Sequence, residues 1–272
     1  MHSCSVIVPC YNEEAYIGRC LASLQSQSQT DVEIIVVDDG STDRSSAIAE
    51  SFGVRVLPGK HRGPGLARNL GVEAANSPIV VFADADMEFH RRYLERLIAP
   101  IQSGVSKGTF HRIEFVANSD NPWAACWTLQ EGCPLGYRLR PDHPPQSPVF
   151  RALLRTEFLR VGGYDDTGYG EDTTISAKLN YLADEAPGAI CFHNNPSSLA
   201  EVFASTRWIG RGNHTPQTFA YALRRTPPVA FWRGLKAAVK NRNLNLIPFR
   251  VCYDAGLLVG MLSRRLGGGH SK

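Results

Sequence analysis

The chain has 272 residues, of which 43% are hydrophobic and 20% are charged, so its composition is that of a globular protein and excludes disordered and low-complexity classes. Its formal net charge of +3 hides an asymmetry. Residues 203–272 carry 12 basic and 1 acidic residue (+11), which leaves 17 basic and 25 acidic residues (−8) in the rest, so the sequence predicts an acidic domain with a basic tail.

The cysteine pattern and the start of the chain predict a cytoplasmic protein. The seven cysteines are odd in number, scattered, and form no close pair of the kind that a zinc site needs, so we interpret them as reduced thiols. No basic start with an apolar stretch and a cleavage site precedes the first strand pattern at Ser5.

The first half of the chain alternates β-branched runs with amphipathic stretches. Ser5–Pro9, Glu33–Val37 and Ile79–Phe82 have the pattern of buried strands. Between them, apolar residues recur at helical spacing: Ile17, Leu21 and Leu24, then Ala47 and Ile48, then Leu66 and Leu70. This alternation predicts an α/β fold with a mostly parallel central sheet flanked by helices.

Acidic loops follow all three expected strands. They are Pro9-Cys10-Tyr11-Asn12-Glu13-Glu14, Asp38-Asp39-Gly40-Ser41-Thr42-Asp43 and Ala83-Asp84-Ala85-Asp86. In sheets of this type the ligand lies beyond the carboxyl ends of the strands. We therefore expect the ligand site at these loops.

Asp84 and Asp86 form an Asp-x-Asp motif directly after a strand, so both carboxylates can face one ligand. Mg²⁺ or Mn²⁺ usually takes one or two protein carboxylates together with water and phosphate oxygens, which suits a diphosphate. Alternatively, the two aspartates only cap the next helix. Asp39 has two interpretations as well: it accepts hydrogen bonds from a base or ribose, or it belongs to a glycine-containing turn.

Two common nucleotide motifs are missing from the sequence. No G-x-G-x-x-G follows the first strand, and no G-x-x-x-x-G-K-[ST] occurs, which argues against a dinucleotide site and a P-loop.

The second half is less regular. Residues 103–148 contain Pro, Gly and aromatic residues without a period, which predicts loops over the site, and the next block predicts a strand over Val149–Leu154, a helix from Glu171 to Leu182 and a strand over Ala189–Phe192. The tail beyond Trp208 has helical stretches. Its longest apolar run, Ala255–Leu262, is shorter than the ~20 residues of a spanning helix, so no membrane span is expected.

With these motifs in order, the sequence resembles the inverting GT-A glycosyltransferases of family 2. The resemblance covers about residues 4–210 and rests on Val6-Ile7-Val8-Pro9 with Tyr11-Asn12-Glu13, Val36-Val37-Asp38-Asp39-Gly40-Ser41-Thr42-Asp43, Gly65-Leu66-Ala67-Arg68-Asn69, Ala83-Asp84-Ala85-Asp86 and Gly170-Glu171-Asp172. It implies a GT-A catalytic domain over 1–207, with a Rossmann-like nucleotide-sugar half over about 1–102 and an acceptor half over about 103–207. A basic helical extension would occupy 208–272.

The resemblance also implies roles for individual residues. Those expected around the nucleotide are Pro9, Tyr11, Glu13, Asp39, Arg68 and Asp84; the expected ligands of Mn²⁺ or Mg²⁺ are Asp86, Asp84 and His193; the expected catalytic residues are Asp172 as the base and Glu171 beside it. A solvated helix face for Arg68, a helix cap for Asp172 and an ordinary packed histidine for His193 are the alternatives.

The implied activity is transfer of a single sugar, with inversion, from a nucleotide-sugar donor such as a UDP-sugar to the hydroxyl of a sugar or lipid-linked acceptor. Arg207-Trp208 resembles the end of the Q-x-x-R-W motif of processive members, but Ala204 stands where Gln or Arg is expected, which argues against processivity.

Two alternatives remain open at this stage. A sugar-phosphate nucleotidyltransferase shares the nucleotide-and-metal logic, although its first loop is normally basic and rich in glycine, whereas this one is acidic and lacks glycine. A non-enzymatic binder would use the basic tail on a membrane or nucleic-acid surface. We expect no nucleic-acid partner. The tail either docks on an anionic inner membrane face, as in a peripheral cytoplasmic enzyme, or packs its apolar residues against the catalytic domain while its Lys and Arg are solvated.

Overall fold

The computed structural model describes residues 2–167, 169–212 and 215–265. They fall into two compact units: unit 1 comprises Met1–Phe115, Leu139–Asp166 and Glu171–His193, and unit 2 comprises Val116–Arg138, Thr167–Gly170 and Asn194–Lys272. The domain boundaries expected from the sequence, at residues 102 and 207, stay predictions.

Unit 1 is built on an eight-stranded sheet in the order β3-β2-β1-β4-β9-β6-β10-β8. Its strands are β1 (Cys4–Cys10), β2 (Val32–Asp38), β3 (Arg55–Pro58), β4 (Ile79–Phe82), β6 (Gly108–Phe110), β8 (Gln146–Ser147), β9 (Ala152–Leu154) and β10 (Ala183–Glu185). The first four run parallel, as expected, while β9 is antiparallel to both β4 and β6.

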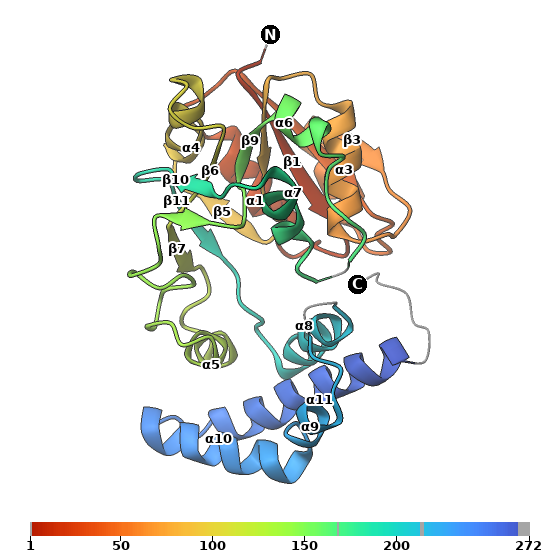
Figure 1. Ribbon diagram of the computed structural model, residues 1–272, viewed down its shortest axis with the longest axis vertical. Helices are drawn as coiled ribbons and strands as arrows, with labels where there is room; N and C mark the ends of the chain where they lie inside the picture. The colour runs from red at the N-terminus through yellow and green to blue at the C-terminus, as the bar shows by residue number, and fades with distance from the viewer. Residues whose placement is uncertain (1, 168, 213–214, 266–272) are drawn as a thin grey trace. The chain divides into compact units, whose positions relative to one another are not determined.

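Helices cover both faces of this sheet (Figure 1). They are α1 (Ile17–Gln25), α2 (Ser45–Ser51), α3 (Pro64–Ala74), α4 (Tyr93–Gln102), α6 (Arg155–Arg160) and α7 (Thr174–Leu179). Alternate residues of a strand point to opposite faces. Val6 and Val8 therefore join one core with α1, α2 and α4, while Ile7 joins the other with α3, α6 and α7.

A second, three-stranded sheet has the order β5-β11-β7. Its strands are β5 (Met87–Phe89), β7 (Ile113–Val116) and β11 (Ile190–His193). The antiparallel pair of β5 and β11 sets His193 opposite Met87, one residue beyond Asp86. The Asp-x-Asp motif thus lies between the large sheet and this small one.

The region 103–148, expected to form loops, contains strands β6 and β7 and helix α5 (Pro122–Gln130). Apolar residues lie on all sides of α5, so its sequence has no visible helical period. Its start does carry a signal, because the Asn121 side chain accepts the N–H groups of Trp123 and Ala124, and Pro122 occupies the first helical turn. The helix expected to run to Leu182 ends at Leu179, where Asn180 adopts the left-handed conformation (φ 58°).

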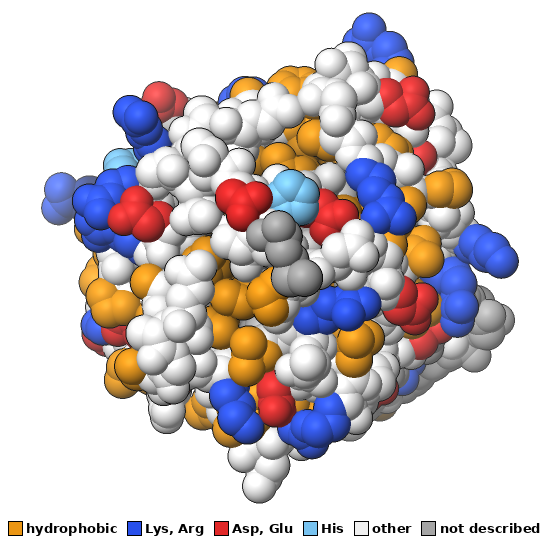
Figure 2. All heavy atoms as spheres, turned by 90° about the horizontal axis from the view of Figure 1, so that it is seen from above, with side chains coloured by type: hydrophobic (Ala, Val, Ile, Leu, Met, Phe, Trp, Pro, Cys, Tyr) orange, Lys and Arg blue, Asp and Glu red, His pale blue; other side chains and the backbone are white. Residues whose placement is uncertain are grey.

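Charges are mixed on the face seen from above. There, Asp and Glu side chains alternate with Lys, Arg and apolar side chains (Figure 2). This face therefore does not present a continuous surface of one sign of the kind that attracts a polyanion.

The described part of unit 2 is mainly helical. Besides α5 it contains α8 (Leu199–Arg211), α9 (Phe219–Leu223), α10 (Pro227–Asn241) and α11 (Leu246–Arg265). Helix α11 packs against α8 and α10, and Trp127 of α5 contacts Phe249 and Tyr253 of α11. Glycines allow the close crossing of α8 and α11, since a Cβ on Gly260 would lie 2.1 Å from the Arg207 carbonyl oxygen.

Among the described residues, one helix is long and apolar enough to cross a membrane. It covers Leu246–Arg264, with a mean hydropathy of 1.4 and half of the window buried inside the protein. From the sequence we expected no such segment, because the longest uninterrupted apolar run, Ala255–Leu262, is too short to span a membrane. Phe249, Tyr253 and Leu257 of this helix belong to the core of unit 2.

Asp254 forms a buried charge cluster within this helix. Its carboxylate is fully buried and contacts the guanidinium groups of Arg225, Arg233 (3.4 Å) and Arg250 (2.9 Å). A buried charge that loses its partner is strongly destabilising. The cluster therefore links α10, α11 and the segment before α10.

Replacing Asp254 with asparagine is expected to lower the free energy of unfolding by about 3–5 kcal/mol, because Arg225 and Arg250 would remain buried without a counter-charge. Urea unfolding followed by circular dichroism measures the change. Arg233→Gln is the matched control: that side chain is 42% exposed, and its loss should change stability by about 1 kcal/mol or less. Equal effects of the two substitutions would contradict the assignment.

Candidate active site

The carboxyl ends of β1, β2 and β4 lie side by side and bring the three acidic loops to one edge of the sheet. The first two loops are hydrogen-bonded to each other. The Asn12 N–H donates to Ser41 Oγ (3.0 Å), and the Thr42 N–H donates to Asn12 Oδ1 (2.8 Å). The two loops therefore hold each other in place.

Asp39 is buried and uses its carboxylate on the backbone. Its oxygens accept the N–H groups of Arg62 (3.1 Å) and Gly63 (2.7 Å), which lie just before α3. The glycine-containing turn expected as one alternative is present as well, since the Ser41 N–H donates to Asp38 Oδ1 (3.0 Å) and Gly40 has a positive φ (86°). The role of Asp39 toward a nucleoside stays a prediction.

The residues expected near the nucleoside on the first loop lie together at the end of β1. Pro9 pairs with Val37 of β2, and the Tyr11 ring lies 4.3 Å from the ring of His61, centroid to centroid. The Glu13 carbonyl oxygen accepts the Ile17 N–H and thereby begins α1. Their predicted contacts with a nucleoside remain predictions.

Asp84 lies between two arginines. Its Oδ1 is 2.6 Å from Arg68 Nη2 and its Oδ2 is 2.9 Å from Arg151 Nη1. Burial alone would raise the pKa of this carboxyl, but Arg151 and Arg68 outweigh burial and hold the pKa far below its ordinary value. Asp84 is therefore ionised, with an arginine on each oxygen.

Glu171 anchors the other side of Arg68, at 2.8 Å from Arg68 Nη1. It is buried, and burial raises its pKa although Arg68 opposes the shift. Gly65 makes room for this contact, because a Cβ there would lie 2.8 Å from Glu171 Cγ. Two motifs noticed separately in the sequence, around Arg68 and around Glu171, thus form one ion-paired group.

Asp172 follows Glu171 in a short 3₁₀ turn (Glu171–Thr173) and is only partly buried. Within the described part of the chain its carboxylate has no hydrogen-bonded side chain. Of the two adjacent carboxylates, Asp172 is therefore the one available to receive a proton, whereas Glu171 is engaged with Arg68. The catalytic roles of both stay predictions.

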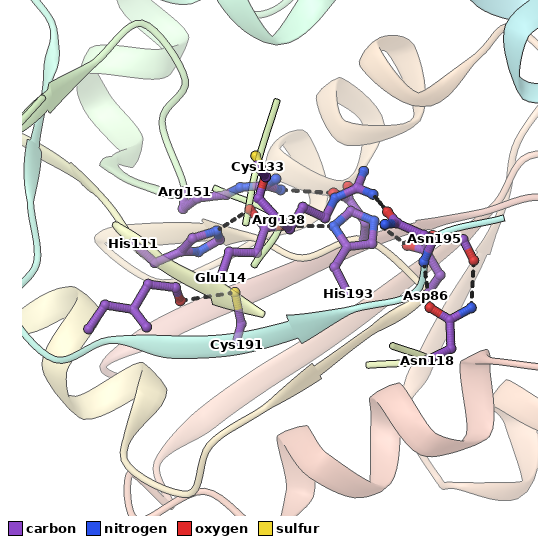
Figure 3. A network of polar contacts seen from close by, with 12 residues as sticks. Asp86, His111, Glu114, Asn118, Cys133, Arg138, Arg151, Cys191, His193 and Asn195 are labelled. Atoms are coloured by element: carbon purple, nitrogen blue, oxygen red, sulfur yellow. Dashed lines mark hydrogen bonds and ion pairs between the residues drawn. The ribbon is translucent and has the colours of Figure 1, made fainter. Parts of the chain in front are cut away.

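A chain of polar contacts runs through His193 (Figure 3). His193 Nε2 lies 3.1 Å from Asp86 Oδ1, and its Nδ1 lies 2.7 Å from Glu114 Oε1. The second oxygen of Glu114 lies 3.4 Å from His111 Nε2. Burial opposes ionisation of Glu114, but hydrogen bonds from both histidines hold its pKa well below the ordinary value.

The pair formed by Asp86 and His193 fits a divalent cation. Two ligand atoms about 2.1 Å from one ion and at right angles to each other are about 3.0 Å apart, close to the 3.1 Å observed. The carboxylate suits Mg²⁺ and Mn²⁺, and the imidazole suits Mn²⁺ better than the oxygen-preferring Mg²⁺. Asp84 fits less well while both of its oxygens contact arginines, and its metal role stays a prediction.

Three residues of this site were missed in the sequence: Arg151, Glu114 and His111. Pairing with distant segments brings Arg151 and Glu114 to the site: the Arg151 carbonyl accepts the Phe82 N–H (2.8 Å), and Glu114 lies on β7 beside β11. His111 lies in the short link between β6 and β7. Arg151 did carry a signal, as a charged residue inside the apolar run Val149–Leu154. Glu114 and His111 lay in the region without a visible period.

Comparison with known proteins identifies the family. The model of the family "Glycosyl transferase family 2" matches residues 5–160, more than half of the chain. This protein belongs to glycosyl transferase family 2. The match confirms the resemblance in the sequence and favours a sugar transferase over a nucleotidyltransferase.

Curated members of the family resemble this chain over part of their length. It is 40% identical over 222 residues to the uncharacterized glycosyltransferase EpsJ of Bacillus subtilis, covering 73% of this chain and 63% of EpsJ. It is 27% identical over 250 residues to the pre-mycofactocin glycosyltransferase of Mycobacterium tuberculosis, covering 86% and 51%. The chain thus spans less than two thirds of these relatives.

Solved structures share the fold. Mannosyltransferase PcManGT from Pyrobaculum calidifontis, in complex with GDP-Man and Mn²⁺, has a TM-score of 0.59 at 18% identity, covering 97% of this chain and 87% of that one. S. aureus TarS 1-349 in complex with UDP has a TM-score of 0.56 at 20% identity, covering 98% and 92%. Glucosyl-3-phosphoglycerate synthase from M. tuberculosis, in complex with Mn²⁺, UDP and glucosyl-3-phosphoglycerate, has a TM-score of 0.51 at 25% identity, covering 76% and 77%. The GT-A fold, with its mostly parallel sheet and helical C-terminal part, is confirmed.

Proposed function

We propose that this glycosyltransferase moves a single sugar, with inversion, from a UDP-sugar to an acceptor hydroxyl and requires Mn²⁺ or Mg²⁺. The observation that carries the proposal is the pairing of Asp86 with His193 at ligand distance, beside the carboxyl edge of the sheet. Diphosphates are commonly bound through such an ion. The solved structure of glucosyl-3-phosphoglycerate synthase with UDP and Mn²⁺ supports this choice of donor and metal.

The chain's own residues supply the rest of the chemistry. A cation on Asp86 and His193 would neutralise charge on the departing diphosphate. Arg68 and Arg151 hold the Asp84 carboxylate in one orientation, toward the ribose in our proposal. Asp172 accepts the proton of the acceptor hydroxyl while the hydroxyl oxygen bonds to the anomeric carbon of the donor sugar. The bond from that carbon to the diphosphate breaks in the same step. A single displacement of this kind inverts the anomeric centre.

Calorimetric titration with UDP tests the donor and the metal together. We expect tight UDP binding in Mn²⁺ and weak binding in EDTA. Competition with GDP then shows whether the site prefers uracil or guanine as the nucleobase. Incubation with a panel of nucleotide sugars then identifies the sugar, and NMR of the product anomer tests inversion. UDP binding that is insensitive to EDTA would contradict the proposed metal dependence.

We further propose that the basic tail docks on an anionic membrane surface that carries the acceptor. A pocket of about 170 Å³ in unit 2 is lined by Tyr221, Arg224, Arg225, Val229 and Arg233. Of these arginines Arg224 is exposed, whereas Arg225 and Arg233 pair with Asp254. On α10, Phe231 and Trp232 are exposed (45% and 61%). Arginines gain about 1 kcal/mol each near anionic lipid, and exposed aromatic rings prefer the interface.

The protein is expected to sediment with phosphatidylglycerol vesicles at low salt and to stay in solution with phosphatidylcholine vesicles, because attraction to anionic headgroups drives docking. Replacing both Phe231 and Trp232 with serine should weaken binding about tenfold or more. Val105→Ser, at an 82% exposed position of unit 1, is the matched control and should bind normally. A wild-type protein that remains in the supernatant with the anionic vesicles excludes docking.

A further inference from the structure

Glu114 is a buried carboxylate on β7, an edge strand of the small sheet. Its neighbour β11 carries His193. Burying a carboxylate is costly unless it is paired. Both of its oxygens are used: one faces His193 Nδ1 (2.7 Å) and the other faces His111 Nε2 (3.4 Å), as Figure 3 shows. The structure therefore places this charge between two imidazoles.

The contact determines which nitrogen of His193 faces the site. An ionised carboxylate only accepts hydrogen bonds, so His193 Nδ1 must carry a proton where it meets Glu114. The other nitrogen, Nε2, then points toward Asp86, 3.1 Å away. A metal-binding histidine usually has this arrangement, with its second nitrogen donating to a carboxylate that fixes the ring.

The contacts behind Glu114 hold it in turn. His111 Nδ1 lies 2.9 Å from the hydroxyl oxygen of Tyr93, a fully buried residue of α4. The series Tyr93, His111, Glu114, His193 and Asp86 thus connects the core under the large sheet to the Asp-x-Asp motif. Each member is fixed by at least one neighbour, so the orientation of His193 is set by the fold.

We propose that Glu114 is the positioning residue of the metal site: it fixes the tautomer and ring orientation of His193 so that Nε2 and the Asp86 carboxylate form one ligand pair. The inference rests on the proposed function and adds a residue to it. Glu114 acts through His193 and does not touch the cation or the sugar.

The Glu114 carboxylate could instead bind a cation directly, and this alternative can be distinguished from positioning of His193. Ligand atoms of His111, Glu114 and Cys191 lie within 4.8 Å of one another and are all buried. A cation held there would contact Glu114 directly and would not need His193. The two arrangements predict opposite results when His193 is removed.

The test is a double-mutant cycle on Mn²⁺ affinity, measured in saturating UDP by the electron paramagnetic resonance signal of free Mn²⁺. Glu114→Gln should weaken Mn²⁺ binding about 10- to 100-fold, since glutamine has one oxygen where the carboxylate has two and cannot accept from both histidines. Glu114→Asp keeps the charge and both oxygens and should retain more of the affinity. Glu88→Gln, the same charge change at a partly exposed residue of β5, should leave it unchanged.

The His193→Ala background identifies the route of the effect. There, Glu114→Gln should weaken Mn²⁺ binding no further, because the residue through which Glu114 acts is gone. Mn²⁺ affinity that is normal in Glu114→Gln, or a loss of equal size with and without His193, overturns the inference. Wild-type protein that binds UDP but no Mn²⁺ would instead overturn the metal-dependent function, and this inference with it.

Discussion

Asp86→Ala is expected to reduce sugar transfer by about 10³-fold or more, because a metal ion contributes several kcal/mol to stabilising the departing diphosphate. Asp86 supplies the carboxylate that faces His193, so its loss leaves a single imidazole at that position. Initial rates with a saturating donor measure the effect. Mn²⁺ affinity should fall in the same variant.

The control for this substitution is Glu88→Gln, which removes a carboxylate from the adjacent strand, where it pairs only loosely with Arg19 (3.4 Å). Its rate should stay within about twofold of wild type, as expected for a surface pair. Normal activity of Asp86→Ala in the presence of EDTA would show that the mechanism does not use a metal.

Asp172→Asn is expected to lower kcat by about 10²–10⁴-fold, the usual contribution of a positioned general base. UDP should bind to the variant normally, because the Asp172 carboxylate takes no part in the ion pairs of Arg68 with Asp84 and Glu171, at the edge of the sheet where we propose that the nucleotide binds. Rates at saturating donor and acceptor, together with UDP titration, separate the two quantities.

Two further variants sharpen this test. Asp165→Asn removes a half-exposed carboxylate paired with Lys178 and should leave kcat nearly unchanged. Glu171→Gln should weaken UDP binding, because it frees Arg68 from one of its two partners. A full-rate Asp172→Asn enzyme, or one that has lost UDP binding, would exclude the role of an acceptor-side base.

The sequence by itself determined that the three acidic loops meet at one edge of the sheet. Patterns at β1, β2 and β4 are local, since each is a short buried run followed directly by its polar loop. Parallel strands place their carboxyl ends together, so the sequence alone predicts that the Asp39 and Asp84 loops meet. The family resemblance rested on the same local motifs, and the family model confirms it.

Only the tertiary structure decided which side chains complete the site. Arg151 reaches Asp84 because β9 pairs antiparallel with β4, and His193 reaches Asp86 because β11 pairs with β5. Helix α5 was not predicted from the sequence, because its residues are apolar on all sides and show no helical period. Local patterns specify elements and loops, but the register between strands about 70 to 110 residues apart depends on packing that no short segment encodes, and that register selects the partners of Asp84 and Asp86.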